Sequence, residues 1–447
     1  MSARPRARKL LFFGAALIGI VHILTSFEGR TPFYISIGTI QIYLFDLLAL
    51  AFAAMGGVLL LRRRRFTSID FIFLAIVTIS VVQFLRGTAI YATQAGVEFR
   101  QDAFVLCSLL FLMGTSSFYR HTRRDFLVIV ALYAGAGLLI YGLRALGLAP
   151  QSAFDLTFNQ GIWRAWRFIG ADEALGVIGL AMTCFSLAIY GSNQGHSLSP
   201  ARSLNYWLYG AAAVILAFIA MHRSVWAVGI VALPLFFALQ MRYRLMTPRS
   251  FEISFVIAIA AVLTVTVAFF MSTNLQSAAG EVSAVNSTLN WRTAGWESLI
   301  KLMVPQDYIL GRGYGADYSR LALGQVIKNS AHNFYLAKLW QLGVLGLALY
   351  IILYVSAVTA LVRIARRPRD LEDRALATLL IALIAGELVF FVVYANWIPS
   401  ILLMGYTLGF IRSVNISRPR HRRWPVQLRP RGTQPTQADS AIRLRTL

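Results

Sequence analysis

Long apolar runs recur along almost the whole chain, and they constrain the fold more than any other feature of the sequence. They are roughly 16 to 30 residues long, and a helix needs about 20 residues to cross ~30 Å of hydrocarbon at 1.5 Å per residue. The chain is also 57% hydrophobic and only 14% charged, which lies outside the usual balance of soluble domains. These features predict an all-α polytopic membrane protein.

We predict about twelve transmembrane helices and one large loop between the ninth and the tenth. The predicted spans are 10–27, 40–61, 69–85, 101–118, 126–146, 171–190, 206–221, 224–240, 251–271, 333–362, 375–395 and 397–411. The chain is therefore divided into an N-terminal segment 1–9, spans 1 to 9 within 10–271, the loop 272–332, spans 10 to 12 within 333–411, and a basic tail 412–447.

The distribution of basic residues predicts the orientation of these spans. If the N-terminus is cytoplasmic, the segments on the cytoplasmic side hold 29 of the 42 Lys and Arg residues, as the positive-inside rule requires. Inverting the topology would put the clusters at 62–65 and 366–369 on the wrong side. We therefore predict a multi-pass membrane protein with both termini in the cytoplasm and the loop 272–332 on the outer side.

The net charge of +23 does not indicate nucleic-acid binding, because the Arg clusters are short and lie next to predicted spans. In that position they fix topology and meet anionic lipid headgroups. The tail is rich in Arg, Pro and Gln, and we predict that it is disordered and associated with membrane lipids. Both cysteines, Cys107 and Cys184, lie within apolar spans, so no disulfide framework or thiolate metal site is expected.

The loop 272–332 contains more chemically active residues than a simple connection needs. Its apolar positions from Leu289 to Met303 follow helical spacing and predict a helix on the outer membrane face, with Trp291 and Arg292 near its start. The run 311–315, Gly-Arg-Gly-Tyr-Gly, follows no strand, so it is a weak nucleotide-binding signal. It instead predicts a close turn in which the amides of Gly313 and Gly315 approach an anionic or sugar ligand.

His332 closes the loop and stands where the next apolar run begins. That run is longer than a bilayer needs, so we expect its first turns to project to or above the outer headgroups, with Ser330 as a possible helix cap. The positive end of a helix dipole favours a neutral imidazole that can accept a proton. Asn333 follows directly, and Tyr335 falls on nearly the same face as His332. A histidine that merely marks the membrane interface is the alternative interpretation.

Two further groups of arginines lie near the outer face. Arg223 sits in a very short connection between two spans that are short for a full crossing, about 24 to 26 Å. The connection is therefore predicted to be recessed, which would place the guanidinium in a cavity suited to a diphosphate. Arg164 and Arg167 alternate with tryptophans in the run 163–167. They indicate either an interfacial aromatic belt with snorkelling arginines or a site that recognises a lipid diphosphate or sugar.

Taken together, these residues resemble the bacterial O-antigen ligases and the related O-antigen and exopolysaccharide polymerases. The resemblance consists of the twelve-span topology with its large ninth-to-tenth loop and of four motifs. The motifs are Arg223-Ser224-Val225-Trp226, Asn290-Trp291-Arg292, the glycines 311, 313 and 315, and His332-Asn333. The specific residues lie between about 163 and 346.

The resemblance implies transfer of a glycan from undecaprenyl diphosphate to a sugar hydroxyl, without a cofactor, at the periplasmic face of the bacterial inner membrane. Arg223 and Arg292 would bind the diphosphate, and His332 would act as general base or orient the acceptor. The acceptor is either lipid A core, as in a ligase, which the single dominant loop favours, or another lipid-linked repeat, as in a polymerase. A flippase for the same lipid is the non-enzymatic alternative.

No metal site is expected, because the acidic residues of the loop lack ligand spacing. These residues are Glu281, Glu297, Asp307 and Asp317. Two further acids, Asp46 and Glu387, lie inside predicted spans and need partners or water. We expect them to be structural or to relay protons, and the sequence assigns neither a specific role.

Overall fold

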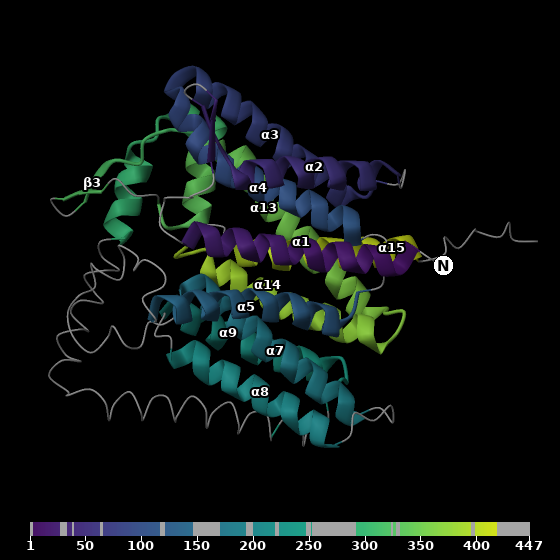
Figure 1. Cartoon of the computed structure of the whole chain (residues 1–447). Coiled ribbons are helices and arrows are strands. Elements are labelled where there is room, and N and C mark those ends of the chain that lie inside the picture. The colour runs from purple at the N-terminus through teal and green to yellow at the C-terminus, as the bar shows by residue number, and fades with distance from the viewer. Residues whose placement is uncertain are drawn as a thin grey trace, which may run out of the picture.

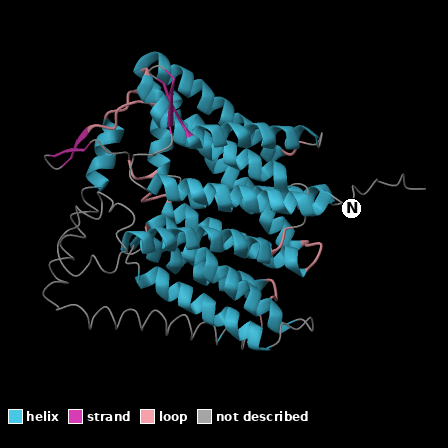
Figure 2. Cartoon of the chain, viewed as in Figure 1, coloured by secondary structure: helices cyan, strands magenta, loops and turns pink. Residues whose placement is uncertain are grey.

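The chain forms a bundle of long helices with two short antiparallel hairpins at one end (Figures 1 and 2). The structure is a computed structural model. It describes residues 3–26, 34–37, 40–62, 66–116, 121–145, 170–193, 200–219, 223–246, 252, 292–322, 325–327, 331–394 and 398–417. The hairpins add strand structure to a chain that the sequence predicts to be entirely helical.

Eleven of the twelve predicted spans coincide with long helices among the described residues. These are α1 (Ala3–Ser26), α2 (Leu44–Arg62), α3 (Ser68–Tyr91), α4 (Thr93–Ser116), α5 (Arg123–Ala145), α7 (Ala171–Asn193), α8 (Pro200–Ile219), α9 (Arg223–Arg242), α13 (Phe334–Arg366), α14 (Leu371–Phe390) and α15 (Ile398–Ser417). The ninth predicted span, 251–271, lies outside the described residues except for Glu252.

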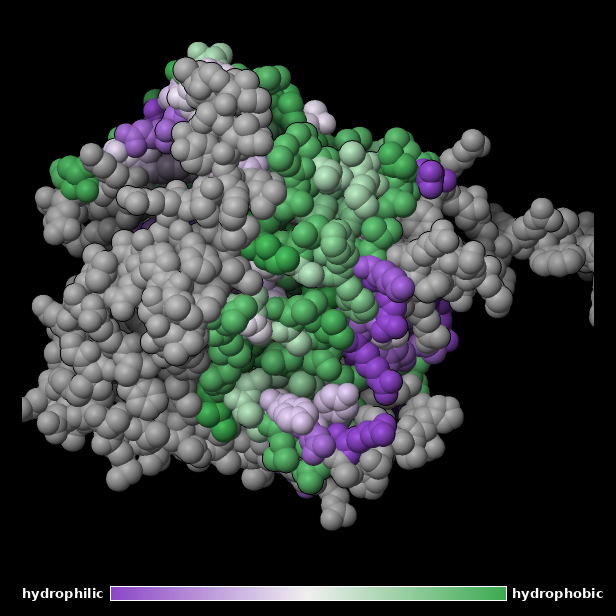
Figure 3. All heavy atoms as spheres, viewed as in Figure 1, coloured by the Kyte–Doolittle hydropathy of each residue, from purple (hydrophilic) through white to green (hydrophobic). Residues whose placement is uncertain are grey.

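Four of the described helices are both long and apolar enough to cross a membrane. These segments are Ser68–Tyr91, Ala171–Ile189, Ser224–Arg242 and Phe334–Arg366. α4, by contrast, contains the charged residues Glu98, Arg100 and Asp102 in its first half. Hydrophobic residues form a broad band across the visible helices, and hydrophilic residues gather at the end where the N-terminus lies (Figure 3). The protein is therefore an integral membrane protein, and the count of twelve spans stays a prediction.

The two hairpins and the ends of several helices differ from the prediction. β1 (Tyr34–Ile37) pairs with β2 (Ile40–Tyr43), so α2 begins at Leu44 and not at residue 40. Apolar and polar residues alternate in this segment, which suits a strand. α3 and α4 also extend through 86–100, which we expected to connect two spans. Only Ala92, with φ 50°, interrupts them.

Ion pairs tie together the helix ends that lie near the N-terminus. Arg8 pairs with Asp125 at 2.7 Å, and Arg123 pairs with Glu372 at 2.7 Å. Arg412 pairs with Asp70, and both side chains are buried. These contacts join segments that the charge distribution predicts on one side of the membrane. Which side faces the cytoplasm stays a prediction.

At the opposite end of the bundle, the helix α13 is broken at Gly343. Gly343 has φ 70° and ψ −173°, so the outer segment 334–342 and the inner segment 344–366 are separate helical pieces. Such a break leaves carbonyls at the end of the outer segment without helical donors. The amides of Arg312 and Gly313 supply two donors, to the carbonyls of Trp340 at 2.7 Å and Gln341 at 3.1 Å.

Gly343→Ala is expected to destabilise the protein, because glycine is required at this break. A Cβ there would lie 2.2 Å from the Ile309 carbonyl oxygen and 2.5 Å from the Gly311 nitrogen. Its backbone conformation alone costs a side-chain-bearing residue about 1–3 kcal/mol. The melting temperature of the purified protein in detergent should fall. Gly57→Ala in α2 is the control, since nothing lies within 4 Å of a Cβ there; equal melting temperatures for the two variants would contradict the prediction.

Candidate functional site

The described part of the large loop packs on the outer segment of α13. It comprises a helix at 292–301, α12 (Pro305–Leu310), the glycine turn 311–315, and β3 (Arg320–Ala322) paired with β4 (Gln325–Ile327). We call these residues, 292–327, the outer unit; its hairpin projects beyond the bundle in Figure 1. A hydrophobic cluster joins Leu299 and Met303 to Leu336 and Trp340 of α13. A helix is therefore present where one was predicted, and its residues Leu299 and Met303 pack on α13, whereas Ile300 is exposed.

The glycine turn fills a crevice between α3, α4 and α13. All three glycines have positive φ values. A Cβ at Gly311 would lie 2.5 Å from the Gln341 carbonyl oxygen, and one at Gly315 would lie 2.5 Å from the Ala95 nitrogen. The amide of Gly313 donates to Gln341, and that of Gly315 donates to Glu98 at 2.5 Å. Both amides thus donate to acceptors within the protein. That they bind a ligand stays a prediction, and these hydrogen bonds do not favour it.

His332 lies in the short connection between the outer unit and α13. Trp296 holds the preceding residue, since its indole nitrogen donates to the Ala331 carbonyl at 2.7 Å. Asn333, and not Ser330, caps the helix: its side-chain oxygen accepts from the Leu336 amide at 3.0 Å, whereas Ser330 lies outside the described residues. His332 has φ 47°, a left-handed conformation that histidine tolerates better than most residues but still uncommon. The imidazole is therefore set by a constrained backbone at the start of α13.

The surroundings of His332 keep its imidazole neutral. Partial burial lowers the pKa of His332 below 6.5, and the charges of Arg292 and Arg320 contribute smaller shifts in the same direction. Burial disfavours the charged ring, and each guanidinium repels a second positive charge. At neutral pH the ring can therefore accept a proton, which is what a general base requires.

Arg292 begins the helix 292–301 and turns toward the segment that follows α14. One of its terminal nitrogens lies 3.5 Å from the Val393 carbonyl, and its guanidinium carbon lies 5.9 Å from the Tyr394 ring centre. Its Nε is buried without a hydrogen-bond partner among the described residues. A buried guanidinium donor of this kind is costly unless a ligand binds it, so Arg292 is a candidate for binding an anion.

Arg320 is a member of the site that the sequence did not predict. It starts β3, is 5% exposed, and donates from a terminal nitrogen to the Tyr318 carbonyl at 2.9 Å. Its charge acts on His332 together with that of Arg292. The sequence around Arg320 has no pattern that predicts a buried arginine near His332, because each strand of the hairpin that carries it is only three residues long.

Asn333 and Tyr335 fasten this region to the end of α14. The Asn333 side-chain nitrogen donates to the Val392 carbonyl at 2.9 Å, and the Tyr335 hydroxyl donates to the Leu388 carbonyl at 2.9 Å. The Phe334 amide donates to the Phe391 carbonyl at 2.9 Å. These bonds give the two predicted substrate-binding residues positions within the protein, and contact with substrate stays a prediction for both.

The remaining predicted site residues are not brought to the site by the described structure. Arg164, Arg167 and Trp291 lie outside the described residues. Arg223 begins α9, but its side chain is not among those described. α8 and α9 each have 20 residues, about 30 Å, so they are longer than predicted and their lengths give no reason to expect a recessed connection. The indole of Trp226 donates to the Phe218 carbonyl at 3.0 Å and closes this hairpin.

The two acids predicted within spans have different surroundings. Asp46 lies 3.1 Å from Arg100 and accepts from the Tyr43 amide at 2.9 Å, which is a structural role at the start of α2. Glu387 is 1% exposed, and neither carboxylate oxygen has a hydrogen-bond partner within the described residues. The hydroxyls of Tyr354 and Ser400 lie beside it.

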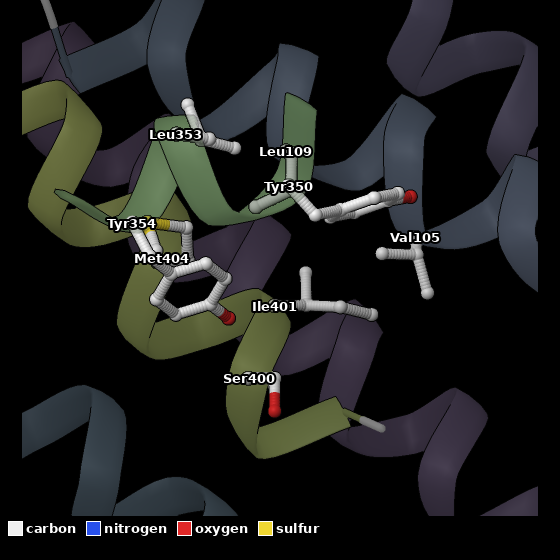
Figure 4. Close-up of a pocket in the computed structure, with 8 residues that line it drawn as sticks. All are labelled: Val105, Leu109, Tyr350, Leu353, Tyr354, Ser400, Ile401 and Met404. Atoms are coloured by element: carbon white, nitrogen blue, oxygen red, sulfur yellow. The ribbon is translucent and has the colours of Figure 1, made fainter. Parts of the chain in front are cut away.

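Tyr354 and Ser400 also line a small pocket that is mostly apolar (Figure 4). The pocket lies between α4, α13 and α15, and the residues drawn there do not include His332 or Arg292. Across the part of the chain that the structure describes, no cluster of three or more His, Cys, Asp or Glu residues could hold a metal ion.

Residues 208–351 match the family described as O-antigen ligase. Over these residues the chain is similar to O-antigen ligases. The matched segment contains Arg223, Arg292, Arg320 and His332, and it ends within α13. This similarity supports a membrane enzyme of the ligase or polymerase type in polysaccharide biosynthesis. No curated protein matches the chain.

Proposed function

We propose that the enzyme transfers a glycan from undecaprenyl diphosphate to a sugar hydroxyl of lipid A core, at the periplasmic face of the inner membrane. The observation that carries the proposal is the half-buried His332 next to the charges of Arg292 and Arg320, inside the segment that matches the O-antigen ligase family. A base beside cationic groups suits a reaction that deprotonates an alcohol while a diphosphate leaves. Both termini are proposed to be cytoplasmic.

In the proposed reaction, the acceptor hydroxyl attacks the anomeric carbon of the donor glycan. The new bond joins that carbon to the acceptor oxygen, and the bond between the same carbon and the diphosphate oxygen breaks. His332 takes the hydroxyl proton, and undecaprenyl diphosphate leaves with the bonding electrons. Arg292 compensates its negative charge with forked hydrogen bonds. We assign Arg223 the same task, and Arg164, Arg167 and Trp291 recognition of the lipid-linked donor.

The test is to supply purified protein with lipid-linked glycan and with separate acceptors. Glycan attached to lipid A core supports the proposal. Lengthened lipid-linked chains without transfer to lipid A core would instead identify a polymerase, which uses the same donor. Movement of the lipid across vesicles without any new glycosidic bond would identify a flippase and contradict the proposed chemistry.

The transfer rate is expected to depend on pH through His332. Its pKa lies below 6.5 because of burial and the neighbouring charges, and the neutral imidazole is the active form. kcat/KM should therefore be constant at neutral pH and fall only as the pH drops through this lowered pKa, when the ring becomes protonated. A fall that already begins above pH 7 would contradict a base with this pKa.

Transfer is expected to continue when divalent metal ions are removed. The diphosphate is neutralised by arginines in this proposal, so no metal is required to stabilise the leaving group. The rate should be measured in an excess of chelator, with the chelator saturated with Mg²⁺ as the control. Loss of transfer that Mg²⁺ restores would show that the arginines are insufficient.

A further inference from the structure

A polar cluster outside the site joins α4 to the outer unit and to the outer segment of α13. Glu98 and Asp102 lie four residues apart on α4, and such residues share one helix face. The Glu98 carboxylate accepts from the Gly315 amide at 2.5 Å, the Tyr318 hydroxyl at 2.8 Å and the Gln341 side chain at 2.6 Å. Three donors from two different parts of the chain thus converge on one carboxylate.

Asp102 repeats this pattern one turn further along α4. It accepts from the Tyr314 hydroxyl at 2.6 Å and pairs with the Lys338 ammonium. Lys338 is 4% exposed and also donates to the Gln341 side-chain oxygen at 3.0 Å. Hydrogen bonds to carboxylates are stronger than those between neutral groups, so the two acids hold the glycine turn and the outer segment of α13 firmly on α4.

Two short connections lead from this cluster to the candidate site. The first runs through Tyr318: its hydroxyl donates to Glu98, and its carbonyl accepts from Arg320, whose charge acts on His332. The second runs along α13, because Lys338 and Gln341 belong to the helical segment that begins two residues after His332. Loss of the cluster would therefore shift both a neighbour of the imidazole and the segment that carries it.

We propose that Glu98 and Asp102 are positioning residues for glycan transfer: from α4, they fix the positions of His332 and Arg320. The inference rests on the proposed function, because it assigns these acids to the same site. They do not contact substrate themselves. Misplacing reacting groups by about 1 Å can cost about 10²-fold in rate, so a contact away from the chemistry can control kcat.

The first experiment compares Glu98→Gln and Glu98→Ala with wild-type protein, all purified as full chains. Glu98→Gln keeps the size of the side chain but turns one acceptor into a donor, which conflicts with the Gly315 amide or the Gln341 amide. Both variants should lower kcat, by about 10²-fold for alanine, with a smaller effect on the donor KM. The acidic limb of the pH profile should move toward 6.5, because Arg320 is no longer held beside His332. Glu297→Gln, on the exposed face of helix 292–301, is the control and should leave all three readouts unchanged.

A second variant tests whether the hydrogen bond itself is responsible. In the double variant Glu98→Gln with Gln341→Glu, the amide introduced at position 98 donates to the carboxylate introduced at position 341, so the bond is restored in the opposite direction with the same total charge. Its kcat should exceed that of Glu98→Gln alone. A double variant no more active than the single one would overturn the proposal, as would wild-type kcat and an unchanged pH profile in Glu98→Gln.

Hydrogen exchange separates a failure of this inference from a failure of the proposed function. In Glu98→Gln, amides in 311–322 and 331–342 should exchange faster, while those of α8 and α9 are unchanged. This measurement needs no substrate. If wild-type protein transfers no glycan, the proposed function is wrong whatever the exchange shows. If wild-type protein is active and exchange in these segments is unaffected by the variant, the positioning role is wrong.

Discussion

Replacing His332 by glycine is expected to abolish glycan transfer while the protein still folds and accumulates in the membrane. A positioned general base contributes about 10²–10⁴-fold to a rate, and this variant removes the imidazole. Glycine also accepts the φ of 47° at this position without strain. Alanine would remove the same ring but keep a strained backbone, so glycine separates the loss of chemistry from a loss of stability. Transfer by purified protein and the amount of protein in the membrane should both be measured.

His332→Asn provides a second, independent variant. Asparagine also adopts left-handed backbone readily, and it forms hydrogen bonds but is not a base at neutral pH. If it is as inactive as the glycine variant, the imidazole acts by accepting a proton; substantial activity would show that it orients the acceptor instead. Lys301→Gln, an exposed change on the nearby helix, should retain full activity. Transfer near the wild-type rate in both His332 variants would remove this residue from the mechanism.

The apolar runs predict most of the helices because burial of hydrocarbon in lipid dominates their sequence. The same signal fails at the helix ends. The predicted third span ends just before Arg86, and the predicted fourth span begins just after Arg100. In the structure, α3 and α4 continue through 86–100 because these residues pack on the outer unit. Arg86, for example, donates to the Gly311 carbonyl at 2.8 Å. Hydropathy records contact with lipid, and it cannot report polar helix turns that are stabilised by a distant part of the chain.

The candidate site shows the same division between local and distant information. His332 and Arg292 are identified by their place in the loop and by the family resemblance. The surroundings that control them were not predicted: Arg320 on a three-residue strand, and the carbonyls of 391–394 beyond α14. For the glycine turn, the sequence predicts flexible backbone, but only the fold shows that the flexibility serves close packing against α4 and α13. Residues that make contact but lie about 60 to 100 positions apart in the sequence leave no periodic pattern from which the contact could be predicted.

Replacing Arg292 by alanine is expected to reduce transfer by about 10²–10³-fold, the usual effect of removing one group that stabilises developing negative charge. Wild-type Arg292 has a buried Nε without a partner in the described part of the chain, and its contact with the Val393 carbonyl is long, at 3.5 Å. The guanidinium is therefore not needed to satisfy the fold. The alanine variant should remain folded, and its rate should be measured at saturating donor and acceptor.

Arg292→Lys distinguishes charge from geometry at the same position. Lysine keeps the positive charge but lacks the planar fork that can bind two oxygens of a diphosphate. If the guanidinium binds the leaving group, the lysine variant should be less active than wild type and more active than the alanine variant. Its KM for the donor should also rise more, relative to wild type, than its KM for the acceptor. The His332 pKa should stay low in the lysine variant, because a positive charge still faces the imidazole, and should rise toward 6.5 in the alanine variant. A lysine variant with wild-type rate and donor KM would mean that Arg292 serves only to keep His332 neutral, so the two variants separate binding of the diphosphate from tuning of the base.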